Sequence, residues 1–128
     1  MTTGNEILAV ALALMGSAVE TERYEERAAA GIDMLLTDLY RLDRALKGEA
    51  AAPAAAVPHL SSLEDEVPLA DILTRSLMPV GLAAFLLSEE EEKRAAFFEE
   101  LYRTEREVLI RGFVPGRRHA IRSVYGGL

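Results

Sequence analysis

The sequence contains no cysteine and no tryptophan, and aromatic residues make up only 6% of it. Without cysteine, disulfide bonds and thiolate chemistry are excluded, so two histidines remain as the neutral nitrogen ligands for a metal ion. Few windows alternate polar and apolar residues with period two, which disfavours β-strands. Alanine, leucine and glutamate dominate instead, and this composition favours helices.

Long hydrophobic runs are also lacking. The first apolar run, residues 7–15, is followed by small residues in the manner of a signal peptide, but Glu6 precedes it and no basic segment does. No run approaches the roughly 20 residues of a spanning helix. We therefore expect a cytosolic, soluble protein with no membrane contact.

Charge is unevenly distributed along the 128 residues, which carry a net charge of −7. This sign argues against general or sequence-specific nucleic-acid binding, which needs many basic contacts to phosphates. Residues 113–128, however, contain three arginines and no acid. The chain thus divides into one acidic helical domain, residues 1–112, and a basic tail, residues 113–128, that could bind an acidic surface on another protein or another copy.

The first two helices are expected on either side of Gly16-Ser17. Asn5 is the expected N-cap of the first, which ends near Met15 and is apolar on every side, as in a buried helix or a subunit interface. The second helix is expected over residues 20–47, closed by Gly48. Its apolar residues recur at three- and four-residue spacing: Tyr24, Ala28, Ile32, Leu35, Leu39 and Leu42 or Leu46.

Glycine and proline mark special positions in and after the second helix. Gly31 in its middle predicts a close helix crossing, because glycine there costs about 1 kcal/mol relative to alanine. Residues 49–57 are rich in alanine and proline and predict a loop. A third helix is expected from near Leu69, kinked or divided by Pro79, and Gly81 lets another backbone approach.

Ser88 and Glu91 form the pattern of a capping box, so a fourth helix is expected over residues 89–111, with Gly112 as its stop. Its expected core residues are Ala96, Phe97, Leu101, Val108 and Leu109, flanked by Phe98, Tyr102 and Ile110. The fold class is therefore all-α: a small bundle of four to five helices with a long second helix, a proline-kinked third helix and a flexible C-terminal tail.

Patterns that would indicate chemistry are weak. The glutamates of residues 89–92 diverge on a helix and so make a poor metal site. Neither His59 nor His119 follows a glutamate by three residues, as di-iron bundles require. Ser61 and Ser62 lie near His59 in a loop without an oxyanion signal. We expect no catalytic residue, no metal and no cofactor.

Two charged segments remain as candidate partner interfaces. One is an acidic loop, which is either solvated or in contact with a basic partner: Glu64, Asp65 and Glu66. The other is basic and aromatic, and it suits an interaction tail or a solubilising end better than a grip on nucleic acid: Arg117, Arg118, Arg122 and Tyr125. Whether this tail is a strand, a helical turn or a disordered arm is open.

Two blocks of sequence resemble the small helical head-to-tail connector proteins of tailed bacteriophages and prophages. The first runs from Tyr24-Glu-Glu-Arg-Ala28 to Leu36-Thr-Asp-Leu39. The second joins an acidic, proline-bearing loop, residues 63–69, to Gly81-Leu-Ala-Ala84 and Phe97-Phe-Glu-Glu-Leu-Tyr102. The segment 121–127 is also similar to prophage members of this group. Val80 departs from the pattern, since an aromatic residue is common there.

The resemblance implies a structural protein without catalytic activity. It implies self-association into a ring that docks on the portal protein and carries tail or stopper proteins, located in the virion neck after synthesis in the bacterial cytoplasm. On this view residues 113–128 reach a neighbouring subunit or the portal. The alternative is a non-enzymatic bacterial adaptor or regulatory module that dimerises through its first helix.

Overall fold

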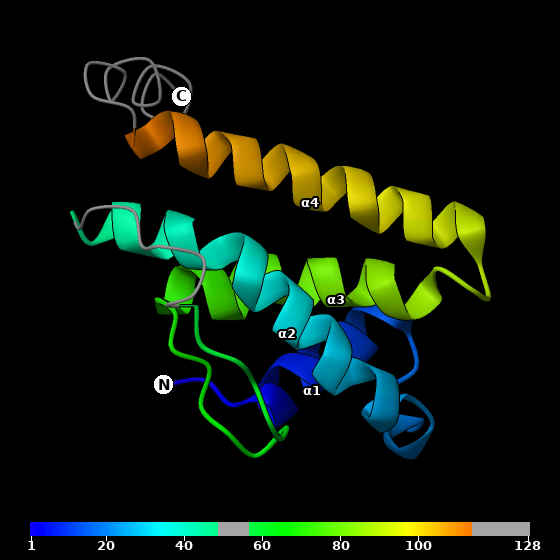
Figure 1. The fold of residues 1–128 in the computed structure, drawn as a ribbon. Helices are drawn as coiled ribbons and strands as arrows, with labels where there is room; N and C mark the ends of the chain where they lie inside the picture. The colour runs from blue at the N-terminus through cyan, green and yellow to red at the C-terminus, as the bar shows by residue number, and fades with distance from the viewer. Residues whose placement is uncertain (49–56, 114–128) are drawn as a thin grey trace.

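The structure is a computed structural model that describes residues 1–48 and 57–113, and it is an all-α bundle (Figure 1). The elements are α1 (Gly4–Met15), α2 (Thr21–Leu46), the π-helical turn η2 (Leu73–Leu77), α3 (Met78–Leu87) and α4 (Glu92–Phe113). Within the described ranges the sole β-type pairing is an isolated bridge between Thr3 and Glu66. The predicted fold class is confirmed.

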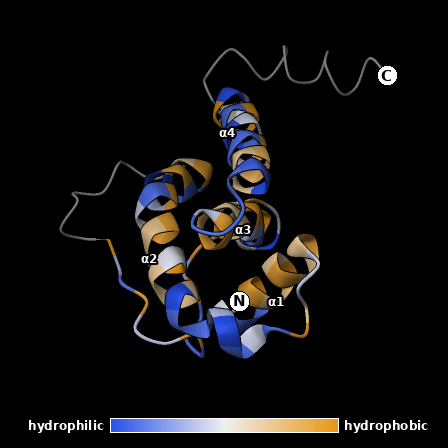
Figure 2. Cartoon of the chain, turned by 90° about the vertical axis from the view of Figure 1, so that its right-hand side faces the viewer, coloured by the Kyte–Doolittle hydropathy of each residue, from blue (hydrophilic) through white to orange (hydrophobic). Residues whose placement is uncertain are grey.

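Helix α3 is the centre of the bundle. It is apolar on every side, and α1, α2 and α4 all pack against it (Figure 2). Met78, Leu82 and Leu86 are completely buried. Because α3 has no polar face to expose, three other helices must cover it, and α2 and α4 do so with one face each while their opposite faces carry charge.

Helix α1 begins at Gly4, earlier than expected, and its N-cap is a different residue from the predicted one. The N-cap is Thr3, whose hydroxyl accepts the Glu6 N–H while the Glu6 carboxylate accepts the Thr3 N–H. The prediction of Asn5 as the cap is therefore wrong, because the Thr-x-x-Glu capping box lies two residues before it. The C-terminal end is as expected: Gly16 has φ of 74° and stops the helix in the left-handed region.

The corrected cap gives a stability prediction with an internal control. Thr3→Ala removes the side-chain acceptor for the Glu6 N–H and should lower the free energy of unfolding by about 1 kcal/mol. Asn5→Ala should change it by less than about 0.5 kcal/mol, since Asn5 lies exposed inside the first turn. Urea denaturation of the two variants checks this, and a larger loss for Asn5→Ala would contradict the assignment of the cap.

The long helix α2 confirms the predicted spacing and the close crossing. A Cβ added at Gly31 would lie 2.7 Å from Phe85 Cδ2 and 2.8 Å from Leu82 Cδ1, so α3 side chains occupy the space of a larger residue. Leu36 is completely buried although the expected stripe contained Leu35, which is only partly buried. The stripe is therefore wider than predicted, as is usual for a helix that packs on a core.

Pro79 lies inside a helical run that continues without a break from residue 71 to residue 87. The turn before it is π-helical, and the Met78 N–H bonds to the Leu73 carbonyl. Proline lacks an N–H and crowds the preceding turn, so the wider π turn accommodates it. The kink that the sequence predicted is thus a change in helical geometry rather than a division into two helices.

The predicted capping box at Ser88 is wrong. Ser88 has helical φ and ψ and closes α3, because its hydroxyl donates to the Phe85 carbonyl at 2.7 Å. Helix α4 starts at Glu92, and the Glu91 carbonyl accepts the Ala95 N–H at 2.9 Å. A serine at a helix boundary can cap either helix, and here the preceding one takes it.

The buried face of α4 differs from the expected one by about one position. Ala95 and Phe98 are buried, whereas Ala96 is exposed and Phe97 has 64% of its surface exposed. Phe97 instead meets Phe98 edge to face, with ring centroids 5.3 Å apart. Of the other residues expected in the core, Leu101 and Leu109 pack partly buried against it.

Candidate functional site

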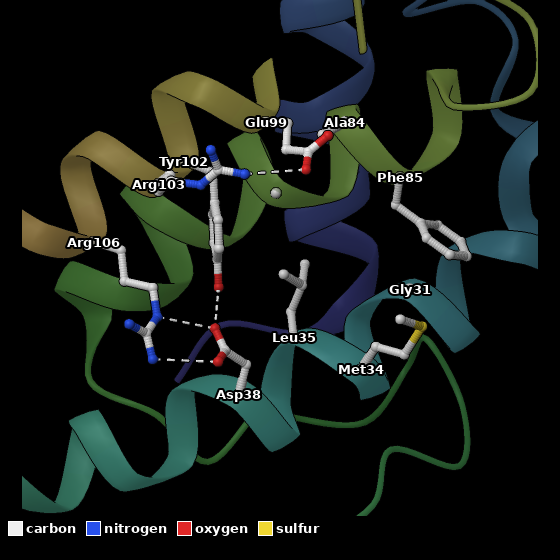
Figure 3. A pocket seen from close by; sticks show the side chains of 11 residues that line it. Gly31, Met34, Leu35, Asp38, Ala84, Phe85, Glu99, Tyr102, Arg103 and Arg106 are labelled. Atoms are coloured by element: carbon white, nitrogen blue, oxygen red, sulfur yellow. Dashed lines mark hydrogen bonds and ion pairs between the residues drawn. The ribbon is translucent and has the colours of Figure 1, made fainter. Parts of the chain in front are cut away.

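A groove of about 480 Å³ lies between α2, α3 and α4 (Figure 3). We name it the α2–α4 groove. It is lined by residues of all three helices: Gly31, Met34, Leu35, Asp38, Gly81, Ala84, Phe85, Glu99, Tyr102, Arg103 and Arg106. Its volume is within the roughly 300–1,000 Å³ of ordinary binding clefts.

The floor of the groove is apolar and depends on a glycine. A Cβ added at Gly81 would lie 2.7 Å from Leu35 Cδ2 and 2.9 Å from the Tyr102 ring. The side chains of Leu35 and Tyr102 therefore lie directly over the α3 backbone. The sequence predicted a close approach at Gly81, and the groups that make it are these side chains rather than another backbone. Met34, with 62% of its surface exposed, stands at the rim.

One wall of the groove is a charged network centred on Asp38 (Figure 3). Its carboxylate accepts the Tyr102 hydroxyl at 2.7 Å and two guanidinium N–H groups of Arg106 at 3.0 and 3.2 Å. Burial, followed by the hydrogen bond to Asp38, raises the pKa of Tyr102 well above its ordinary value. The network joins α2 to α4 and keeps the phenol neutral over the ordinary pH range.

The other charged residues of the lining, Glu99 and Arg103, are also neutralised within the chain. Arg103 lies 3.4 Å from a Glu99 oxygen and 3.4 Å from a Glu100 oxygen, all on α4. Charged groups that are already paired contribute little binding free energy to a charged ligand. Burial of the apolar floor contributes more, because it removes apolar surface from water. The groove is therefore suited to the apolar side chains of another polypeptide.

The raised pKa of Tyr102 predicts a pH dependence. The neutral phenol is favoured in the folded state, so its contribution to stability is complete below the unfolded pKa of about 10 and is lost as the pH rises toward the higher folded value. The wild type should thus lose stability above about pH 10, and Tyr102→Phe should show a smaller loss. Denaturation as a function of pH measures this; an equal loss in both proteins would contradict it.

The acidic loop predicted as a partner interface lies outside this groove. Asp65 is exposed, and its carboxylate accepts two N–H groups of its own loop, from Ser62 at 3.0 Å and from Ser61 at 3.3 Å. Glu64 and Glu66 are exposed. The backbone of this loop is tied to the N-terminus, where the Gly4 N–H donates to the Asp65 carbonyl at 3.1 Å. A partner contact here stays a prediction.

The basic candidates Arg117, Arg118, Arg122 and Tyr125 lie outside the described residues, and of the predicted tail only Phe113 is described, as the last residue of α4. The structure therefore neither joins them to the acidic loop nor separates them from it.

Residues 1–48 and 57–113 contain no group of three or more His, Asp or Glu side chains arranged to hold a metal ion. In the same ranges no helix is long and apolar enough to span a membrane. His59 is exposed, with Nδ1 3.3 Å from Asp33 Oδ2 on α2.

The sequence did not predict the groove. One signal was present, since Gly31 and Gly81 lie on facing helices and both line the groove. What the sequence lacks is the pairing of Asp38 with Tyr102 across 64 positions. Comparison with known proteins adds no assignment: no protein-family model, no curated protein and no solved structure matches the chain.

Proposed function

We propose that this chain is a structural assembly protein without catalytic activity, a head-to-tail connector that self-associates into a ring, docks on a portal protein and carries tail or stopper proteins. The observation that carries the proposal is the α2–α4 groove, because it is an apolar surface of binding-site size with its charges already paired.

The position of the resembling residues supports this proposal. Asp38 from the first block and Gly81, Ala84 and Tyr102 from the second are far apart in sequence but line the same groove. Residues that serve only the core would not need to meet at a surface. A surface built from the residues that carry the resemblance is consistent with a binding role for that pattern.

The distribution of charge also supports assembly by unlike surfaces. All 21 acidic residues precede residue 113, and the three arginines that follow are without an acid among them. A contact between an acidic surface and a basic tail joins two different surfaces, and such contacts close into rings when repeated with rotation. The tail is thus suited to reach a neighbouring subunit or the portal.

Reversing the charge of the tail tests the connector proposal. The wild-type chain, mixed with the portal protein encoded beside it, should sediment as a complex of fixed stoichiometry. The variant Arg117→Glu/Arg118→Glu should lose that complex while keeping the thermal unfolding of the wild type, because the change lies beyond Phe113, where α4 ends. A wild-type chain that never binds the portal would contradict the proposal.

One observation favours the alternative of a bacterial adaptor that acts as a dimer through α1: this helix exposes the apolar side chains Val10 and Leu14. The two functions differ in valence. A connector assembles beyond a dimer or assembles on the portal, whereas the adaptor remains a dimer that is indifferent to the portal.

A further inference from the structure

The outward face of α1 is a second unpartnered apolar surface. It consists of four residues, and we name it the α1 face: Ala9, Val10, Ala13 and Leu14. Their spacing places them on one side of the helix. Val10 has 43% and Leu14 has 45% of its surface exposed, and no charged residue lies among the four. A helix normally turns charged or polar residues to water, so this face is suited to binding a partner.

Helix α1 cannot rotate to bury the α1 face in the core of its own molecule. The opposite face of α1 is already buried there through Ile7, Leu8 and Leu12. The C-terminal end of the helix is fixed as well, because the Arg94 guanidinium of α4 donates to the Met15 carbonyl. Among residues 1–48 and 57–113, the α1 face thus stays exposed and is open to another molecule.

The α1 face is also remote from the groove of the same copy. Helix α1 packs on α3, α2 and η2, and it lies across α3 from α4 (Figure 2). The groove is formed on the other side, where α2 and α4 flank α3. Each copy thus has two apolar surfaces that differ in shape, one convex and one concave, and that cannot meet within one molecule.

The α1 face and the α2–α4 groove are compatible in charge, because neither presents a net charge to the other. Asp38 is paired with Arg106, and Glu99 is paired with Arg103, so the walls of the groove offer no net charge to a ligand. An uncharged helix face leaves these pairs intact and covers the apolar floor. The α1 face has this character.

We propose that the α1 face of one copy docks in the α2–α4 groove of the next copy. This inference rests on the proposed function in that it names the contact by which the ring is built. The two surfaces are different, so the contact is heterologous: each copy gives its α1 face to one neighbour and its groove to another, and the repeated rotation closes a ring.

The basic tail fits the same groove less well. Residues 114–128 carry three arginines, and Arg103 and Arg106 already stand on the groove walls. Docking the tail there would bring its arginines to a surface whose acids are already paired, so the groove offers them no free carboxylate. An α1-to-α1 dimer, in turn, would cover the α1 face and leave the groove empty.

Two complementary variants of the full chain test the proposal. The face variant Val10→Glu/Leu14→Glu blocks the α1 face, and the groove variant Met34→Glu/Ala84→Leu blocks the groove. Each alone should self-associate about 30-fold more weakly than wild type, the loss expected at the centre of an interface. An equimolar mixture should form a heterodimer and nothing larger, because each copy keeps one intact surface. Sedimentation velocity measures all three samples.

The control is Thr37→Glu, an exposed substitution on α2 outside the groove lining, which should assemble like wild type. Circular dichroism and thermal unfolding establish that the variants fold. If wild type assembles only on the portal, the same variants are compared there, and each should leave the portal with fewer bound copies than wild type.

Several results would overturn the contact. One is a groove variant that dimerises as wild type does, which would indicate α1-to-α1 pairing. Another is a mixture without heterodimer, and a third is a wild type that stays monomeric both in solution and on the portal. The experiments distinguish failure of this contact from failure of the connector function. If the variants form normal rings on the portal, only the contact is refuted. If the mixed variants form a heterodimer but the wild-type chain never binds the portal, only the connector function is refuted.

Discussion

Leu82→Ala is expected to lower the free energy of unfolding by about 2–5 kcal/mol, the largest effect of any single truncation proposed for this chain. Leu82 is completely buried on α3, the helix that every other helix contacts. Its Cδ1 lies 2.8 Å from the position that a Cβ on Gly31 would take, so it fills the crossing of α2 and α3. Alanine would leave a cavity at that crossing, where a tightly packed backbone cannot easily collapse.

Such a loss is a large share of the roughly 5–15 kcal/mol by which a domain of this size is stable. Urea denaturation at constant m-value measures it. Met34→Ala is the matched control, because Met34 is mostly exposed and its truncation should cost less than about 1 kcal/mol. A loss for Leu82→Ala no greater than for Met34→Ala would mean that α3 is not the centre of the core.

The sequence predicted those features that depend on one helix at a time. The apolar spacing of α2 and its length follow from burial of one face, so the expected range 20–47 agrees closely with Thr21–Leu46. Gly31 also gave a correct signal, since glycine inside a helix is costly and implies that something stands where its side chain would be.

The errors occurred where two local solutions compete. Ser88 can cap the helix before it or the helix after it, and only the path of the chain between α3 and α4 decides. Phe97 and Phe98 are equally apolar neighbours, so the sequence does not say which of them faces α3. The structure buries Phe98 and leaves Phe97 largely exposed.

The groove and the buried polar groups could not be predicted because they depend on tertiary contacts. Asp43 is buried on α2, four residues after Leu39 and so on the same side of the helix as the apolar stripe. Its Oδ1 accepts the Ala70 N–H at 2.7 Å, across 27 positions. Asp33, ten positions earlier on α2, accepts the Leu60 N–H at 2.8 Å. Two aspartates thus tie the segment that precedes η2 to α2, a pairing that no periodicity reveals.

Asp43→Ala is accordingly expected to lower the free energy of unfolding by about 2–3 kcal/mol. The Ala70 N–H lies directly before the helical run of residues 71–87, and without the carboxylate it loses its acceptor in a partly buried place. Asp43 also lies 2.9 Å from Lys47, whose side chain is half exposed, so this ion pair contributes less. Most of the loss therefore comes from the hydrogen bond.

Two further substitutions make this prediction specific. Asp43→Asn keeps an oxygen that can accept the Ala70 N–H, so it should recover part of the stability that alanine loses. Asp33→Ala should cost less than Asp43→Ala, because Asp33 is partly open to solvent and water can replace its carboxylate at the Leu60 N–H. Urea denaturation of the three variants gives the order. The contradicting result is a larger loss in the free energy of unfolding for Asp33→Ala than for Asp43→Ala. In that case the hydrogen bond from the Ala70 N–H to Asp43 would not fix the start of the helical run 71–87, which carries Gly81 and the floor of the groove.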